Sequence, residues 1–145
     1  MTEEIYVRDI NNGDFETLTE LIKQLGYPST LSKVSDRLSK INSSKNYKTF
    51  VAEVSGKVVG FIGLSKLYAY EYDGDYVRIV ALIVSEQYRG KGIGSKLVEA
   101  AEKWALEENS IAVSLNSGIN RKEANSFYES IGYSIKGYSF SKSII

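Results

Sequence analysis

The chain has 145 residues, of which 43% are hydrophobic and 25% are charged, values typical of a soluble globular domain. Basic and acidic side chains number 18 each, so there is no net charge to recruit nucleic acid or an anionic membrane, and neither is expected as a partner. Because the chain has no histidine and no cysteine, soft zinc sites, serine–histidine–aspartate triads and cysteine nucleophiles are excluded, and no metal is expected.

A chain of this length fits one domain, residues 1–145, with a core of its own. Its longest unbroken apolar run, Ile79 to Val84, is far shorter than a membrane span requires. The first four residues include two glutamates and no apolar segment follows them, so no secretory signal is expected. The lack of cysteine fits the cytoplasm, which is the predicted location, without requiring it.

The first half of the chain predicts a strand, two helices and two more strands. Apolar residues recur at helical spacing in both helical stretches, and Gly26-Tyr-Pro28 ends the first of them. Ser55-Gly56 and Asp73-Gly74 are hairpin turn sequences, so the strands around them are expected to pair antiparallel. In chain order, the expected elements are a strand near 5–10, helices at 15–25 and 32–41, and strands at 47–54 and 57–67.

Residues 78–98 organise the rest of the chain. The run from Ile79 to Val84 is apolar and rich in β-branched residues, which predicts a strand buried on both faces. A turn with three alternating glycines follows it, and a helical apolar stripe then continues to about Glu107. Strand, glycine turn and helix together aim backbone N–H groups and the positive end of the helix dipole at one point. The sequence therefore predicts a pyrophosphate site built on Gly90, Gly92 and Gly94, with the cationic residues Arg89, Lys91 and Lys96 at its mouth.

Spacing separates the ligand classes that use glycine turns. The nucleoside-triphosphate pattern G-x-x-x-x-G-K-[ST] does not occur in the chain. A dinucleotide fold requires G-x-G-x-x-G, but Ser95 stands where its third glycine should be, and the strands predicted upstream are antiparallel rather than parallel. Nucleotide redox chemistry is therefore disfavoured.

The last part of the chain predicts one more strand, one helix and a closing hairpin. A right-handed crossover would lay residues 111–115 parallel to the strand that ends at Val84. Asn120 and Glu123 have the spacing of a helix N-cap and its N3 partner, and Gly132 is placed to end that helix. Short strands at 133–135 and 138–142 would form the hairpin.

The segment Gln87-Tyr-Arg-Gly90-Lys-Gly92 resembles the [QR]-x-x-G-x-[GA] signature of the GNAT superfamily of acetyl-CoA-dependent N-acetyltransferases. Asn120, Ala124, Phe127-Tyr128 and Gly132-Tyr133 resemble the second sequence element of the same family. The resemblance implies the acyl-CoA N-acyltransferase fold, an α/β (α+β) domain with a mixed, mostly antiparallel sheet flanked by helices. It also makes a homodimer plausible, since dimers are common in the family, although no sequence feature here demands one.

By this resemblance, acetyl-CoA is the cosubstrate, and the backbone of Leu82 and Val84 would pair with its pantetheine arm as if with an added strand. Tyr128 would protonate the departing thiolate, and the alternative for it is a packing role alone. Asn120 lies four residues before Ala124, where three is commoner in the family, so a helix cap is favoured over a cofactor contact. The full cofactor-binding set implied by the resemblance is Leu82, Ile83, Val84, Arg89, Gly90, Lys91, Gly92, Ile93, Gly94, Ser95 and Asn120.

The predicted function is direct transfer of the acetyl group of acetyl-CoA to a primary amine of a small molecule or a peptide. The alternatives are a non-catalytic acyl-CoA-binding regulatory module and an enzyme that acetylates hydroxyl groups. Without histidine, a carboxylate must take the amine proton, directly or through water. The candidates for it are Glu53, Glu71, Asp73 and Glu86, with none preferred. The four tyrosines around Asp73-Gly74 favour pairing across that hairpin, and the alternative is an aromatic wall for a cationic acceptor.

Overall fold

The computed structural model describes residues 3–145, and the chain divides into two compact units. The first unit ends at Ser114, and the second is Leu115–Ile145. Two short 3-10 turns, η1 (Asn12–Asp14) and η2 (Glu86–Tyr88), accompany the main elements. In chain order these elements are β1 (Ile5–Asp9), α1 (Phe15–Gln24), α2 (Leu31–Asn42), β2 (Tyr47–Val54), β3 (Lys57–Tyr68), β4 (Asp75–Val84), α3 (Ile93–Glu107), β5 (Val113–Leu115) and α4 (Lys122–Ser130).

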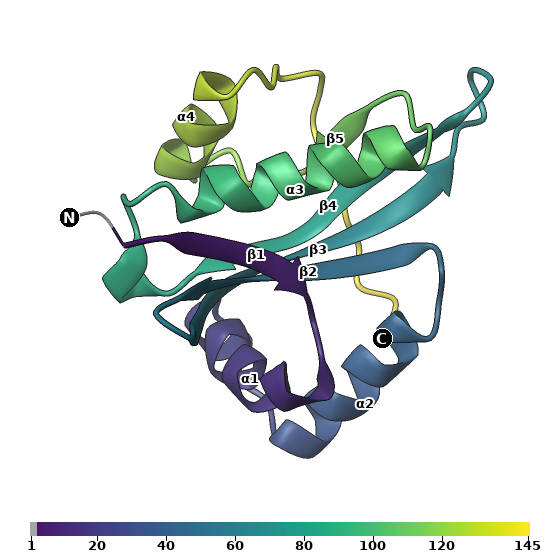
Figure 1. Ribbon diagram of the computed structural model, residues 1–145. Coiled ribbons are helices and arrows are strands. Elements are labelled where there is room, and N and C mark those ends of the chain that lie inside the picture. Colours follow the sequence, from purple (N-terminus) through teal and green to yellow (C-terminus); the bar gives the residue numbers. More distant parts are fainter. Residues whose placement is uncertain (1–2) are drawn as a thin grey trace. The chain divides into compact units, whose positions relative to one another are not determined.

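The five strands form one sheet in the order β1-β2-β3-β4-β5 (Figure 1). The pairs β1–β2, β2–β3 and β3–β4 are antiparallel. Two hydrogen bonds of 2.9 Å join the segment that enters β5 to β4, from the Ile111 N–H to the Asp75 carbonyl and from the Val77 N–H to the Ala112 carbonyl. From the first bond to the second, the residue number rises in both segments, so the two segments run parallel. The predicted mixed, mostly antiparallel sheet is confirmed.

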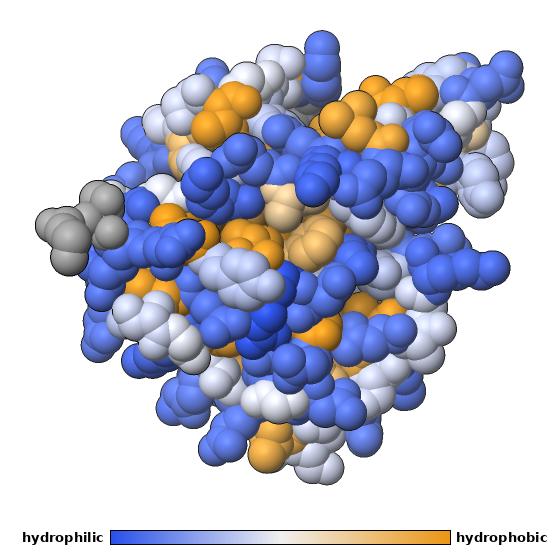
Figure 2. Space-filling view, in the orientation of Figure 1, coloured by the Kyte–Doolittle hydropathy of each residue, from blue (hydrophilic) through white to orange (hydrophobic). Residues whose placement is uncertain are grey.

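Within the first unit, α1 and α2 cover one face of the sheet and α3 lies on the opposite face (Figure 1). The core under α1 and α2 contains Leu18, Val34, Phe61 and Ile83. The face of the molecule drawn in Figure 2 is mostly hydrophilic, and its hydrophobic side chains form scattered groups. The buried residues of α1 and α2 are those of the apolar stripes seen in the sequence, so these stripes pack against the sheet.

A close backbone approach fixes the carboxyl end of β4 against its neighbours. A Cβ on Gly60 would lie 2.8 Å from the Ile83 carbonyl oxygen and 3.4 Å from a methyl carbon of Leu97 on α3. No side chain fits this position, so β3, the end of β4 and α3 are held close together there. The glycine turn that follows β4 is anchored by this contact.

The pairing of β3 with β4 contains a β-bulge. The register passes from Gly63 opposite Ala81 to Leu64 opposite Ile79, which leaves Val80 as the extra residue on β4. The Val80 side chain is 51% exposed, so the prediction that residues 79–84 are buried on both faces is wrong. A bulge depends on the partner strand, and the apolar run alone does not reveal it.

The predicted Asp73-Gly74 hairpin is confirmed, because β3, which ends at Tyr68, pairs antiparallel with β4, which begins at Asp75. Of the four tyrosines, Tyr68 and Tyr76 occupy cross-strand positions, opposite Asp75 and Leu67, whereas Tyr70 and Tyr72 lie outside the strands. Residues 133–145 form no strand, so the predicted closing hairpin is absent from this part of the described chain.

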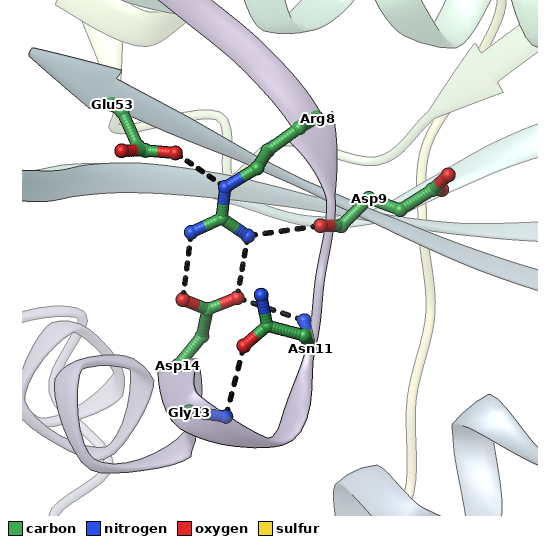
Figure 3. A network of polar contacts seen from close by, with 6 residues as sticks. All are labelled: Arg8, Asp9, Asn11, Gly13, Asp14 and Glu53. Atoms are coloured by element: carbon green, nitrogen blue, oxygen red, sulfur yellow. Dashed lines mark hydrogen bonds and ion pairs between the residues drawn. The ribbon is translucent and has the colours of Figure 1, made fainter. Parts of the chain in front are cut away.

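Arg8 on β1 ties the first strand to the start of α1 and to β2 (Figure 3). Its guanidinium donates two hydrogen bonds to the Asp14 carboxylate, at 2.8 and 2.9 Å, and a third to Glu53. Asp14 also accepts from the Asn11 N–H at 2.8 Å. The hydrogen bonds from Arg8 lower the pKa of Asp14, against the opposing effect of burial, and the Asn11 N–H adds to the lowering.

We expect Arg8→Met to destabilise the fold, because it leaves the buried carboxylate of Asp14 without its cation. The cost should be about 2–3 kcal/mol, somewhat below the roughly 3–5 kcal/mol for breaking a fully buried pair, because the Arg8 side chain is 23% exposed. Since the folded-state pKa of Asp14 is lowered, this stabilisation is complete above its unfolded pKa of about 3.9 and is lost as the pH falls through the folded pKa. Urea unfolding at several pH values measures both effects.

The matched control is Lys48→Met, which removes the cation 2.6 Å from Asp9 on the same sheet. The Asp9 side chain is 65% exposed, so this change should cost less than about 1 kcal/mol. Equal costs for the two substitutions would contradict the role assigned to Asp14.

Candidate active site

The bulge at Val80 determines toward which neighbouring strand the backbone groups of residues 81–84 point. Ser85 donates its N–H to the Val59 carbonyl of β3 at 2.8 Å, so by alternation Ile83 is also a hydrogen-bonding partner of β3. Leu82 and Val84 therefore point their backbone groups to the opposite edge. Before the bulge, Asp75 and Val77 use that same edge to bond residues 111 and 112. Because of the extra residue, the residues that point to the edge away from β3 change from odd-numbered ones before the bulge to Leu82 and Val84 after it.

The turn after η2 is open to solvent. Gly90 and Gly92 have φ angles of +77° and +85°, which glycine adopts without strain. Apart from its chain neighbours, a Cβ at either position would meet no atom of residues 3–145 within 4 Å. Unlike Gly60, these glycines are not required by packing against the protein, so the space they leave is available to a ligand.

The amino end of α3 has no capping side chain. Gly92 occupies the N-cap position, and no acidic side chain lies in the first turn. The first hydrogen bond of the helix runs from the Lys96 N–H to the Gly92 carbonyl at 3.1 Å. The N–H groups of Ile93, Gly94 and Ser95 precede that bond and point toward the turn, together with the positive end of the helix dipole. The chemistry of this end suits an anion with several oxygen acceptors.

Four cationic side chains surround the turn, and two of them are already held. Arg89 donates from Nε to the Val84 carbonyl at 3.1 Å, which folds its side chain back on the end of β4. Lys96 lies 3.7 Å from Glu99. The Lys91 and Lys57 ammonium groups lie instead over the ring of Tyr88, at 5.3 and 6.0 Å from its centroid.

The first unit brings together most of the residues predicted to bind the cofactor. Two members of the predicted set could contribute only through the backbone, because Ile83 and Ile93 are buried, at 5% and 1% exposure. The set at the end of β4, the turn and the first residues of α3 is Leu82, Ile83, Val84, Arg89, Gly90, Lys91, Gly92, Ile93, Gly94 and Ser95. Asn120 and Tyr128 belong to the second unit.

In the second unit, α4 holds Tyr128 in an aromatic cluster. Its ring meets Phe127 and Tyr133 edge-on, with centroid distances of 5.2 and 6.2 Å. The Tyr133 N–H bonds the Tyr128 carbonyl at 3.0 Å, and the Gly132 N–H bonds the Glu129 carbonyl at 3.2 Å. This Schellman arrangement ends α4, as Gly132 predicts. Burial raises the pKa of the Tyr128 phenol, partly offset by the charge of Arg121, so it stays protonated at neutral pH.

Asn120 does not cap α4, so this prediction is wrong. The N-cap residue is Arg121, and no side chain bonds the free N–H groups there. A turn precedes the helix, because the Arg121 N–H bonds the Gly118 carbonyl at 3.0 Å. Asn125, rather than Asn120, braces this turn by donating from Nδ2 to the Gly118 carbonyl at 3.2 Å.

The carboxylates considered as bases differ in how they are engaged. Glu53 accepts from Arg8, so its charge is already paired. Glu71 accepts from the Tyr70 N–H at 3.1 Å, whereas Asp73 and Glu86 have exposed side chains. Within residues 3–145, no three histidine, cysteine, aspartate or glutamate side chains form a group that could hold a metal ion. None of the helices in the same residues has the length and apolar content that a bilayer crossing requires.

Sequence reasoning missed two features of this region. The direction of the β4 backbone depends on the bulge, and the place of Lys57 beside Tyr88 depends on the β2–β3 hairpin. Neither leaves a spacing signal in the sequence, because each joins segments that are distant along the chain.

Comparison with known proteins shows which family and which solved structure the chain resembles. Residues 12–133 match the acetyltransferase (GNAT) family. A crystal structure of a GNAT family acetyltransferase from Staphylococcus aureus is 32% identical, covers 99% of this chain and 100% of its own, and superposes with a TM-score of 0.83. Streptothricin acetyltransferase of Escherichia coli is 28% identical over 70% of this chain and 56% of its own length. Aminoalkylphosphonate N-acetyltransferase of Salmonella typhimurium is 31% identical over 62% of this chain and 58% of its own length.

The chain spans about half the length of the curated relatives it matches. Its fold is nevertheless covered throughout by the S. aureus structure, and it is the acyl-CoA N-acyltransferase fold that the glycine signature implies. The family match takes in both that signature and the Tyr128 element. The chain therefore belongs to the GNAT family of acetyltransferases.

Proposed function

We propose that the protein is an N-acetyltransferase that moves the acetyl group of acetyl-CoA directly to a primary amine of a small molecule or a peptide. The observation that carries the proposal is the open glycine turn at the uncapped start of α3. Gly90 and Gly92 leave space that packing does not require, and within residues 3–145 no side chain caps this helix end and no acidic side chain lies in its first turn. A diphosphate fits a place with several free N–H groups and a positive dipole.

In this proposal the coenzyme is held mainly by the backbone. The N–H groups of Arg89, Gly90, Gly92 and Gly94, with Ser95, bind the diphosphate. Leu82 and Val84 offer N–H and carbonyl groups at the edge of β4, and the amide-containing pantetheine arm pairs with them as an added strand would. The carbonyl of Val84 already accepts from Arg89, and it has a second lone pair for another donor.

Bound acetyl-CoA supplies the acetyl thioester, and the residues of the chain orient it and move protons. The new C–N bond forms as the C–S bond breaks, so the sulfur needs a proton. Tyr128 donates it from Oη, which its raised pKa keeps protonated until that moment. The amine loses its own proton to a carboxylate, directly or through water. Glu53 is the least suited of the candidates, because Arg8 holds its charge.

The acceptor is an amine by analogy with the relatives, whose names record streptothricin and aminoalkylphosphonates as substrates. Because the two names give different acceptors, they support a class of acceptor rather than one compound. A cytoplasmic location, a single domain of residues 1–145 and a homodimer complete the proposal.

The proposal is tested with the purified chain in two measurements. Calorimetry with CoA should detect binding, and release of CoA thiol from acetyl-CoA should depend on an amine in a panel of amino sugars, polyamines, amino acids and peptides. Binding without amine-dependent release would favour the non-catalytic module, and release with alcohols alone would favour hydroxyl acetylation. The absence of CoA binding would overturn the proposal.

A further inference from the structure

The anion site at the glycine turn extends to a second group of cations. Lys91 belongs to the turn itself, whereas Lys57 comes from the first residue of β3, and both ammonium groups lie over the ring of Tyr88. The ring centroid is 5.3 Å from the Lys91 Nζ and 6.0 Å from the Lys57 Nζ. The ring of Tyr88 is thus a neighbour of both ammonium groups beside the turn.

Neither ammonium group has a carboxylate partner within residues 3–145. The ion pairs of this part of the chain use other cations, including Lys96 with Glu99 at the start of α3. The face of a tyrosine ring attracts a cation, but it does not supply the negative charge that would neutralise it.

We propose that Lys57 and Lys91, positioned by Tyr88, bind the 3′-phosphate of coenzyme A. This inference rests on the proposed function, because it places the diphosphate of the same molecule at the adjacent turn. Coenzyme A carries a phosphomonoester on its ribose, separate from the diphosphate, with close to two negative charges at neutral pH. Two lysine ammonium groups match that charge, and as flexible point charges they suit a phosphate.

The glycine turn alone cannot bind both the diphosphate and the 3′-phosphate of coenzyme A. The free N–H groups of α3 serve one cluster of phosphate oxygens, and they lie at a single helix end. A phosphate on a different arm of the ligand requires its own partners. The β2–β3 hairpin brings Lys57 to this place from outside the family signature, so the contact is a property of this chain rather than of the glycine motif.

The test compares CoA with dephospho-CoA, which lacks only the 3′-phosphate, by calorimetry at low ionic strength. Wild-type protein should bind CoA about five- to tenfold more tightly, the range expected for charge pairs at a solvent-accessible site. Lys57→Met should remove most of this preference by weakening CoA and leaving dephospho-CoA within about twofold. Lys57→Arg, which keeps the charge, should restore the preference. Lys103→Met removes an exposed lysine farther along α3 and should change neither affinity.

Each outcome separates this inference from the function on which it rests. If wild-type protein binds CoA and dephospho-CoA equally, the 3′-phosphate contact is overturned and the diphosphate site stands. If Lys57→Met weakens both ligands alike, Lys57 does not act on the 3′-phosphate and the inference is again overturned. If neither ligand binds to the wild-type protein, the proposed function itself fails. Tyr88→Leu should reduce the preference as well, because it releases both ammonium groups from the ring.

Discussion

Replacing Gly92 with valine is expected to lower the affinity for CoA roughly 100-fold or more while the protein stays folded. The valine Cβ would enter space in which, apart from its chain neighbours, no atom of residues 3–145 lies within 4 Å, and in the proposed complex that space belongs to the diphosphate. Losing two charge-assisted hydrogen bonds of about 1.5–3 kcal/mol each accounts for this change, since about 1.4 kcal/mol is a factor of ten. Calorimetry with CoA gives the affinity, and thermal unfolding reports the fold.

The substitution has a second effect that a control must separate. At a φ of +85° a valine is strained by about 1–2 kcal/mol, whatever space surrounds it. Gly26→Val meets the same problem at +107°, also with no atom within 4 Å, just beyond the end of α1. It should lower the melting temperature by a similar amount and leave CoA affinity within about twofold. Equal losses of affinity in the two variants would mean that strain, rather than the ligand site, explains the result.

Local patterns predicted the elements of the first unit well. β2 was predicted to the residue, because Ser55 and Gly56 form the expected two-residue turn with φ angles of +52° and +78°. The helices begin and end within about one residue of their apolar stripes. In these stretches, turn chemistry and periodicity agree with the tertiary structure, so a local reading suffices.

The failures share one cause, which is dependence on another segment. The bulge at Val80 is defined by how β4 pairs with β3, and it turns the backbone groups of Leu82 and Val84 toward the edge away from β3. The expected strands at 133–135 and 138–142 are too short to be stable as an isolated hairpin, and no pattern within them supplies a partner. At residue 120 the cap pattern is present, but the preceding turn at Gly118 starts the helix one residue later.

In the candidate site, too, the features set by local sequence were predicted and those that depend on a distant segment were not. The glycine turn was predicted from its sequence because backbone conformation and helix polarity are local properties. The aromatic cluster around Tyr128 is also local, since Phe127 and Tyr133 are its sequence neighbours. Lys57 beside Tyr88 could not be predicted, because it requires the hairpin and the turn to be placed together.

Tyr128→Phe is expected to lower kcat for acetyl transfer by about 10²–10⁴-fold, the contribution typical of a general acid, while the affinity for CoA changes less than about twofold. Phenylalanine keeps the ring that packs edge-on against Phe127 and Tyr133, so the fold should be unaffected. Only the proton at Oη is lost. Steady-state kinetics with a fixed amine and calorimetry with CoA measure the two quantities separately.

The pH profile distinguishes a proton donor from a hydroxyl that only packs. Because burial raises the pKa of Tyr128, the phenol ionises above its ordinary value of about 10, and wild-type kcat should fall only beyond that pH. The residual rate of the phenylalanine variant should lack this alkaline limb. Tyr138→Phe, at an exposed position of the same unit, should retain both rate and profile. If Tyr128→Phe instead keeps full turnover, another group or water must protonate the sulfur, and the half-buried ring serves packing alone.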